Sequence, residues 1–260
     1  MDFNPGFKIE ATTKPFGFSY GEGVFGPEVE IRTLDSIRRS LSDPHCEGPD
    51  EVYSIAMDVG KKEHFQKLKD IHLLFGVVTY AAGTLGKEPV RSQGHIHKTS
   101  VYANGWSTPE VYEIWSGEAI IYMQETAKDD PGRCFAVLAK PGEMVIVPPF
   151  WAHATVSANP EKPLTFGAWC DRDYGFEYND VRAHGGLAHF PFLENGGGIT
   201  WKHNEKYLHR DLIRKSPRIY KEFDLVPGKP IYTQFEEDKD KFLFVPRPDL
   251  VKEKWEGFIP

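Results

Sequence analysis

The sequence predicts an all-β fold, a sandwich or barrel in which a jelly roll is one way to bury the strands. Eight short segments from Glu51 onward are rich in β-branched and aromatic residues and are bounded by Gly, Pro, Asn or Asp. The 24 Gly and 20 Pro residues indicate many turns, which favours strands over a bundle of helices. No long helical pattern separates the segments, which argues against a parallel sheet with crossover helices.

The predicted elements begin with residues 1–30, where many Gly and Pro and isolated aromatic residues suit an arm or short strands. Residues 32–43 place Leu34, Ile37 and Leu41 at helical spacing, which predicts a short packing helix. The eight strands are then expected at 51–59, 73–83, 107–117, 119–126, 133–142, 144–149, 153–158 and 164–170.

These elements predict a single domain in three parts. Residues 1–50 form an N-terminal arm and short helix, residues 51–206 form the barrel that carries the site, and residues 207–260 form an extension of unknown role. The extension is charged and mixed in composition and predicts a short helix with one or two peripheral strands. A chain of 260 residues is long enough for one such domain with a sizeable core.

Charge and cysteine content exclude several classes of protein. The net charge of −7 gives no electrostatic reason to expect nucleic acid as a partner, although an anionic small molecule is not excluded. Cys46, Cys134 and Cys170 lie far apart without a CxxC spacing, so reduced thiols are expected. There is neither a signal-peptide pattern nor a run of about 18 apolar residues, so we expect a cytoplasmic protein with no membrane partner.

Three histidines and one acid form a candidate metal site. His95 and His97 are two residues apart, so on a strand both imidazoles point to one face. Glu110 begins a later apolar segment, and His153 follows a Pro-Pro turn. Two such histidines alone are more often surface residues, but the added acid and third histidine favour a mixed nitrogen and oxygen site for Fe²⁺, Mn²⁺, Ni²⁺, Co²⁺ or Zn²⁺. Glu113 lies off the Glu110 face and is expected to be a solvated carboxylate.

Four stretches of the chain carry a family resemblance. They resemble the two motifs of the cupins and, more closely, the cupin-type glucose-6-phosphate isomerases first known from archaea. The stretches are GHIH (94–97), PEVYEIWSG (109–117), GEMVIVPPFWAH (142–153) and DYG (173–175). The resemblance covers roughly residues 30 to 205, and the last 55 or so residues have no recognised counterpart.

The resemblance implies a cupin jelly-roll β-barrel that interconverts glucose 6-phosphate and fructose 6-phosphate in glycolysis or gluconeogenesis. It implies one divalent metal ion, with Fe²⁺ as the first expectation, a sugar phosphate substrate and a homodimer. The implied metal ligands are His95, His97, Glu110 and His153. The implied catalytic residues are Glu110, Tyr112 and Tyr174. The implied substrate-binding residues are Tyr53, Thr79, Ser92 and Gly94, and Arg172 is either a further phosphate ligand or a surface arginine.

One departure from the family and one constraint of strand geometry affect the site. The loop over residues 98–109 is longer than in the family and is either a lid or a plain insertion. Strict strand alternation places Ser92 and Gly94 on the opposite face from His95 and His97. A shared pocket therefore requires an irregular strand near Gly94.

Several functions share this ligand set. The alternatives are a cupin isomerase of another sugar, a metal-dependent cupin oxygenase or decarboxylase, and a sugar-binding cupin without activity. For an isomerase, two routes stay open, namely proton transfer through a cis-enediol and a direct hydride shift between the two carbons.

Overall fold

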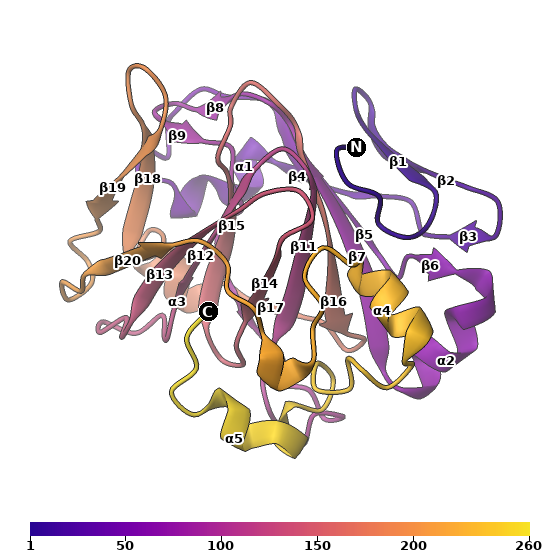
Figure 1. Ribbon diagram of the computed structural model, residues 1–260. Helices are drawn as coiled ribbons and strands as arrows, with labels where there is room; N and C mark the ends of the chain where they lie inside the picture. The colour runs from indigo at the N-terminus through magenta and orange to yellow at the C-terminus, as the bar shows by residue number, and fades with distance from the viewer.

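Two β-sheets face each other in this computed structural model, which describes all residues from 1 to 260 (Figure 1). The large sheet has the strand order β14 (Met144–Val147), β11 (Glu110–Ser116), β16 (Leu164–Asp171), β7 (Leu73–Tyr80), β5 (Glu51–Met57) and β4 (Glu30–Thr33). The small sheet has the order β15 (Ala152–Ser157), β12 (Ala119–Gln124), β13 (Cys134–Ala139) and β20 (Leu212–Lys215). All eight predicted strands are present, which confirms the all-β fold class.

The two sheets are joined by short bridges and not by one continuous ladder. All pairs within them are antiparallel except β13 with β20. The segment before β10 (Ile96–His97) crosses to the small sheet through the isolated bridges Arg91 to Val156 and His95 to His153. This segment therefore places His95 and His97, the first two predicted metal ligands, beside β15 of the small sheet.

Both faces of the large sheet are buried, which explains why its strands have few polar positions. The inner face packs against the small sheet in a core that includes Tyr112, Phe166 and Val137. The outer face packs in a second core of 25 residues that includes Phe75 and Trp169. Alternation along the strands therefore sends successive side chains into two different cores.

The N-terminal arm covers part of that outer face. It contains the hairpin of β1 (Ile9–Thr13) and β2 (Phe16–Tyr20), followed by β3 (Val24–Phe25), which pairs with β6 (Gly60–Lys61). The predicted helix over 32–43 is present as α1 (Leu34–Ile37) followed by a 3₁₀ turn at Arg38–Ser40, with Leu34, Ile37 and Leu41 buried as predicted. A further short helix, α2 (Phe65–Asp70), precedes β7.

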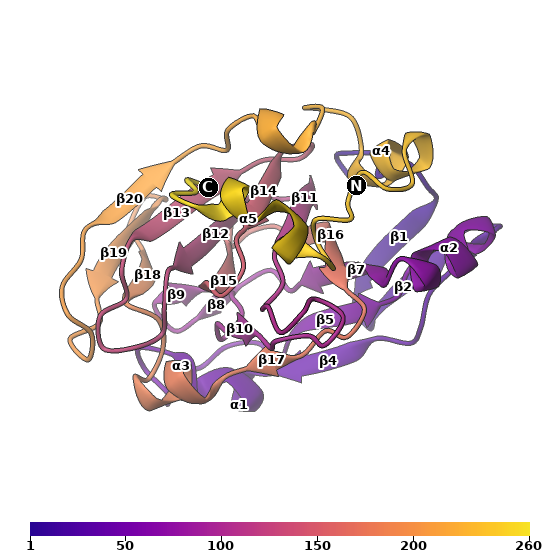
Figure 2. The ribbon, with the colours of Figure 1, turned by 90° about the horizontal axis from the view of Figure 1, so that it is seen from below.

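The C-terminal extension covers the rest of the outer face (Figures 1 and 2). After β20 come a 3₁₀ turn at Lys221–Phe223, helix α4 (Ile231–Glu237), a 3₁₀ turn at Pro248–Val251 and helix α5 (Lys252–Trp255). Tyr232, Phe235 and Phe242 are fully buried in the same core as Phe7 of the arm. The extension therefore packs into the same core as the N-terminal arm. The division of the chain at residues 50 and 206 stays a prediction.

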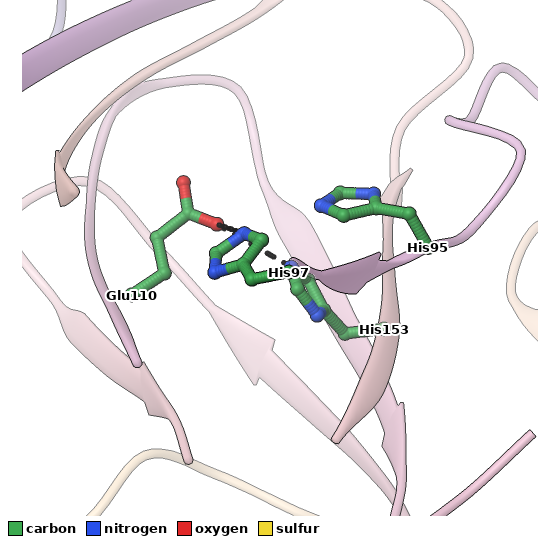
Figure 3. A group of neighbouring side chains, drawn as sticks. All are labelled: His95, His97, Glu110 and His153. Carbon is green, nitrogen blue, oxygen red and sulfur yellow. Dashed lines mark hydrogen bonds and ion pairs between the residues drawn. The ribbon is translucent and has the colours of Figure 1, made fainter. Parts of the chain in front are cut away.

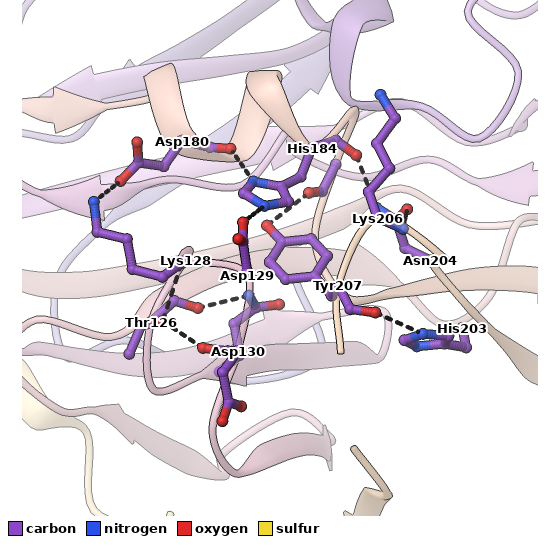
Figure 4. A network of polar contacts seen from close by, with 12 residues as sticks. Thr126, Lys128, Asp129, Asp130, Asp180, His184, His203, Asn204, Lys206 and Tyr207 are labelled. Atoms are coloured by element: carbon purple, nitrogen blue, oxygen red, sulfur yellow. Dashed lines mark hydrogen bonds and ion pairs between the residues drawn. The ribbon is translucent and has the colours of Figure 1, made fainter. Parts of the chain in front are cut away.

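The remaining elements surround the small sheet and the open end. They are β8 (Thr84–Leu85) paired with β9 (Glu88–Pro89), β10 paired with β17 (Phe176–Glu177), helix α3 (Asn179–Ala183), and β18 (His189–Leu193) paired with β19 (Ile199–His203). A polar network fixes α3 to the loop after β12 (Figure 4): His184 lies 2.8 Å from the carbonyl of Asp180 and 3.1 Å from the Asp129 carboxylate. None of the helices has the length and apolar character needed to cross a membrane.

Candidate metal centre and cavity

Four predicted ligands converge between the two sheets. One donor atom from each of His95, His97, Glu110 and His153 lies within 4.8 Å of the other three. The ring centroids of His95 and His153 are 4.3 Å apart, and Glu110 Oε2 lies 3.3 Å from the Nε2 atoms of both His97 and His153 (Figure 3). The prediction that these side chains face one point is confirmed.

Strand pairing brings these distant residues together. The backbones of His95 and His153 exchange two hydrogen bonds, of 3.0 and 2.9 Å, so their side chains stand directly opposite each other. Glu110 is the first residue of β11, and Tyr112 shares its inward face. Three separate segments thus present donors to one point.

Backbone carbonyls orient two of the rings. His97 Nδ1 lies 2.8 Å from the Thr108 carbonyl, and His153 Nδ1 lies 3.2 Å from the Trp151 carbonyl. Each Nδ1–H can donate to its carbonyl, which leaves the Nε2 lone pair directed at the centre.

The His95 ring supplies the clearest sign that a further group belongs here. Its Nε2 is buried and has no hydrogen-bond partner. A buried polar atom without a partner is costly, and a bound cation would pair it. Three imidazole nitrogens and one carboxylate oxygen form a donor set that suits a divalent transition metal, so the residues present fit such an ion.

Burial and mutual contact set the charges of the group. Burial, with the nearby His153 and His97, lowers the pKa of His95 well below its usual range. Burial also lowers the pKa of His153, although Glu110 opposes the change. Burial alone would raise the pKa of Glu110, but contacts with His153 and His97 outweigh it and hold that pKa well below the usual value. Burial opposes protonation of His97, yet contact with Glu110 outweighs it and raises the His97 pKa. The centre therefore offers an ionised carboxylate and at least two neutral imidazoles.

Two neighbouring side chains hold the Glu110 carboxylate. The Tyr112 hydroxyl donates to Oε2 at 2.7 Å, and the Cys170 thiol donates to Oε1 at 3.3 Å. Both residues are buried, and both face inward from strands of the large sheet. Each carboxylate oxygen thus has a defined partner, which restricts its rotation.

The centre opens into a cavity that is rich in aromatic side chains. Its aromatic lining residues are Tyr53, Tyr80, Tyr112, Phe166, Tyr174, Phe176 and Tyr178. Its acidic lining residues are Glu110 and Asp171, and it has neither lysine nor arginine in its lining. An apolar cavity with a few polar groups around a metal centre suits a small organic ligand.

Two of the five predicted substrate-binding residues, Tyr53 and Ser92, line this cavity, as does the predicted catalytic residue Tyr174. They line it together with three of the four candidate metal ligands, His95, His97 and Glu110. The chain is irregular at Gly94, as predicted: its φ is +87°, and a Cβ there would lie 2.8 Å from Leu187. This left-handed conformation lets Ser92 and His95 reach the same space despite their spacing.

Thr79 and Arg172, like Gly94, are not among the residues that line the cavity. Thr79 lies between the lining residues Val78 and Tyr80, so alternation turns it away, and its hydroxyl lies 2.9 Å from that of Thr165. Arg172 donates to both Asp58 carboxylate oxygens at 2.8 Å and to the Leu73 carbonyl at 2.9 Å. The structure supports neither as a phosphate ligand and gives Arg172 a structural role.

Sequence reasoning missed Cys170 and Asp171 at the end of β16. Both line the cavity, and Cys170 contacts Glu110 directly. The sequence did offer a sign of the kind that identified Glu110, namely a polar residue at one terminus of an apolar strand: Glu110 begins β11, and Asp171 ends β16. The missing information was the register that sets β16 beside β11.

Known proteins resemble this chain in sequence over most of its length. The family described as glucose-6-phosphate isomerase (GPI) matches residues 41–210. The glucose-6-phosphate isomerase of Thermococcus litoralis is 30% identical over 204 residues, covering 75% of this chain and 97% of that protein. The glucose-6-phosphate isomerase of Pyrococcus furiosus is 31% identical over 188 residues, covering 70% and 92%. Among solved structures, oxalate decarboxylase from Bacillus subtilis aligns with a TM-score of 0.35 and 17% identity, covering 48% of this chain and 27% of that one.

Proposed function

Because the chain belongs to the glucose-6-phosphate isomerase family, we propose that it interconverts glucose 6-phosphate and fructose 6-phosphate with the help of a divalent metal ion. The observation that carries this proposal is the convergence of three histidines and one glutamate at the wall of an aromatic cavity. A site of this kind suits an enzyme that must polarise a sugar carbonyl or hydroxyl.

The proposed ligands are His95, His97, Glu110 and His153, and Fe²⁺ is the first candidate among the ions that this donor set accepts. The bound ion would supply Lewis-acid chemistry to the oxygens on C1 and C2 of the sugar. The low pKa of Glu110 makes it a good ligand and a weak base. Proton transfer through a cis-enediol and a direct hydride shift are both compatible with these groups.

Tyrosines are the proposed partners of the sugar ring. Tyr112, which holds Glu110, and Tyr174, which is 43% exposed at the cavity, are proposed to move a proton to and from the ring oxygen. Tyr53 stacks on Tyr80 with ring centroids 4.8 Å apart and offers a flat wall to the sugar. These roles also require the substrate to displace water from the cavity.

Neutral donors are the proposed phosphate ligands. Ser92 Oγ accepts a hydrogen bond from the Thr155 amide at 3.1 Å, so its hydroxyl proton can still be donated elsewhere. The Gly94 amide makes no hydrogen bond within the protein and is the second proposed donor. The lack of a lining cation favours one alternative, an isomerase of an unphosphorylated sugar.

The test is an assay of the metal-stripped protein after the addition of single divalent ions. We expect conversion of fructose 6-phosphate to glucose 6-phosphate only after metal is added, with kcat/KM well above that for fructose. A higher kcat/KM for fructose would establish the alternative. Inactivity toward both sugars with every ion, or oxygen consumption, would overturn the isomerase assignment.

We propose further that the protein is a cytoplasmic homodimer. The apolar side chain of Leu138, which stays exposed on strand β13 of the small sheet, supports an interface with a second copy. Light scattering of the purified protein tests the dimer, and a monomeric mass at micromolar concentration would contradict it.

A further inference from the structure

A second carboxylate stands at the cavity with no function assigned so far. Asp171 is the last residue of β16, lines the cavity and is only 2% exposed. Its Oδ1 has no hydrogen-bond partner in the protein. A buried carboxylate oxygen without a hydrogen-bond donor is energetically costly. A ligand that donates a hydrogen bond to Asp171 Oδ1 would remove this cost.

The neighbouring residues do not neutralise Asp171. The adjacent Arg172 guanidinium is held by Asp58, and His72 lies 3.0 Å from the Asp173 carboxylate. Burial raises the pKa of the Asp171 carboxyl, while the Ser100 hydroxyl and His72 oppose that change. A hydrogen bond donated by a hydroxyl group of a ligand would replace part of the solvation that the Asp171 carboxylate has lost through burial.

The backbone around Asp171 is rigid. The Arg172 amide donates to the His72 carbonyl at 2.9 Å, and the Arg172 side chain ties the same turn to Asp58 and Leu73. Asp171 itself pairs with Leu73 in the β16 to β7 ladder. The carboxylate is therefore held in position before any ligand arrives, which lowers the entropic cost of binding.

The strand register places Asp171 far from the proposed phosphate ligands. In the β16 to β7 ladder Asp171 pairs with Leu73 at one end, and Leu164 pairs with Tyr80 at the other. The side chains of Asp171 and Tyr80 thus enter the cavity from opposite ends of this ladder. The Tyr80 hydroxyl lies beside those of Ser92 and Thr155. A phosphate at Ser92 thus avoids the negative charge of Asp171.

We propose that Asp171 binds the substrate by accepting a hydrogen bond from a sugar hydroxyl, and so selects a polyol chain whose phosphate lies at the Ser92 end of the cavity. This inference rests on the proposed function in one respect, that the ligand of the cavity is a sugar phosphate. Hydroxyl groups can pair with the free acceptor, whereas a phosphate dianion offers it no donor and is repelled.

The test compares the wild-type protein with Asp171→Asn and Asp171→Ala. Calorimetry with sorbitol 6-phosphate, which has the polyol and phosphate but no carbonyl, should show an affinity about 10- to 100-fold lower in both variants. Binding of inorganic phosphate alone should be unchanged or tighter. KM for fructose 6-phosphate should rise in parallel, while metal content and the unfolding midpoint stay at wild-type values.

The matched control is Glu177→Gln, which removes a carboxylate that is half-exposed at β17 and pairs with Lys98. It should bind sorbitol 6-phosphate like the wild type. Equal affinity in Asp171→Asn and the wild type would overturn the inference while leaving isomerase activity intact. A wild type that binds the polyol through Asp171 but does not isomerise would overturn the proposed reaction alone. A wild type that does not bind the polyol would overturn the inference, whereas the proposed reaction is decided by the activity assay with added metal.

Discussion

Glu110 and Glu113 lie three residues apart on β11 and face opposite sides of the large sheet. Glu110 points inward to the three histidines, whereas Glu113 is fully buried on the outer side. There it accepts hydrogen bonds from the Ile231 amide at 2.7 Å and the Trp115 indole N–H at 2.9 Å. Because Ile231 is the first residue of α4, the strand that carries Glu110 is also an attachment point of the C-terminal extension.

Replacing Glu113 with Gln should destabilise the fold without emptying the metal centre. The amide group of Gln would face one of the two N–H donors and leave it unpaired in a buried position. We expect a loss of about 1–3 kcal/mol in the free energy of unfolding, measured by urea titration. The control is Glu118→Gln in the turn before β12. Unchanged stability of Glu113→Gln would show that the contact with α4 contributes nothing.

The same carboxyl should make stability depend on pH. Burial raises the pKa of Glu113 from 4.5 to about 8, against the opposing effect of the Ile231 and Trp115 donors. Since the folded state holds this proton more tightly than the unfolded state, the contribution is complete below about pH 4.5 and is lost as pH rises through about 8. The free energy of unfolding should therefore fall more steeply over this range in the wild type than in Glu113→Gln. Parallel pH profiles for the two proteins would refute this origin.

Replacing His153 with Ala should remove bound metal and activity together. The ring contributes one of four donors, and its loss should weaken metal affinity by roughly 100-fold or more, with little change in the circular dichroism of the sheets. Metal analysis by mass spectrometry, beside turnover, is the measurement. His45→Ala, at an exposed histidine, is the control. A His153→Ala variant with full metal content and turnover would exclude this residue as a ligand.

Replacing Arg172 with Ala should affect stability more than substrate choice. The change leaves the Asp58 carboxylate and the Leu73 carbonyl without their donors, which should lower the free energy of unfolding by about 1–3 kcal/mol. Arg172 does not line the cavity, so its loss should not weaken binding of the phosphate group. The ratio of the KM values for phosphorylated and unphosphorylated fructose should therefore stay within about twofold of the wild-type ratio. Loss of a phosphate contact worth about 1.4 kcal/mol would change that ratio tenfold. A rise in KM confined to the phosphorylated sugar would restore a phosphate-binding role.

The convergence of the four candidate ligands could be predicted because its evidence is local. Two histidines at strand spacing share a face wherever the strand lies, and Glu110 begins a strand that is recognisable by itself. The position of Thr79 outside the cavity could not be predicted, because the side of the sheet that it faces depends on the pairing of β7 with β5 and β16. Glu113 was wrongly expected to be solvated because nothing in β11 indicates that residues more than 100 positions later cover its outer face.

The role of the long loop could not be predicted either, because some of its contacts come from the C-terminal extension. Asn104 donates to Asp249 at 3.3 Å, and Arg247, which pairs with Asp249, lies 6.0 Å above the Tyr102 ring. Tyr102 in turn stacks on His72, with ring centroids 4.2 Å apart. The extension therefore holds the loop over 98–109 against the end of β16.

Replacing Asp249 with Ala should loosen this loop while leaving the sheets intact. Both Asn104 and Arg247 lose their partner, so amide hydrogen exchange within 98–109 should become faster, whereas exchange in β11 and β16 should not change. KM for the sugar should rise a few-fold, because Ser100 of this loop lies beside Asp171 at the cavity wall. Asp240→Ala, which breaks an exposed ion pair with Lys67 elsewhere in the extension, is the matched control. Exchange rates in the loop that match those of the wild type would show that the extension does not hold it.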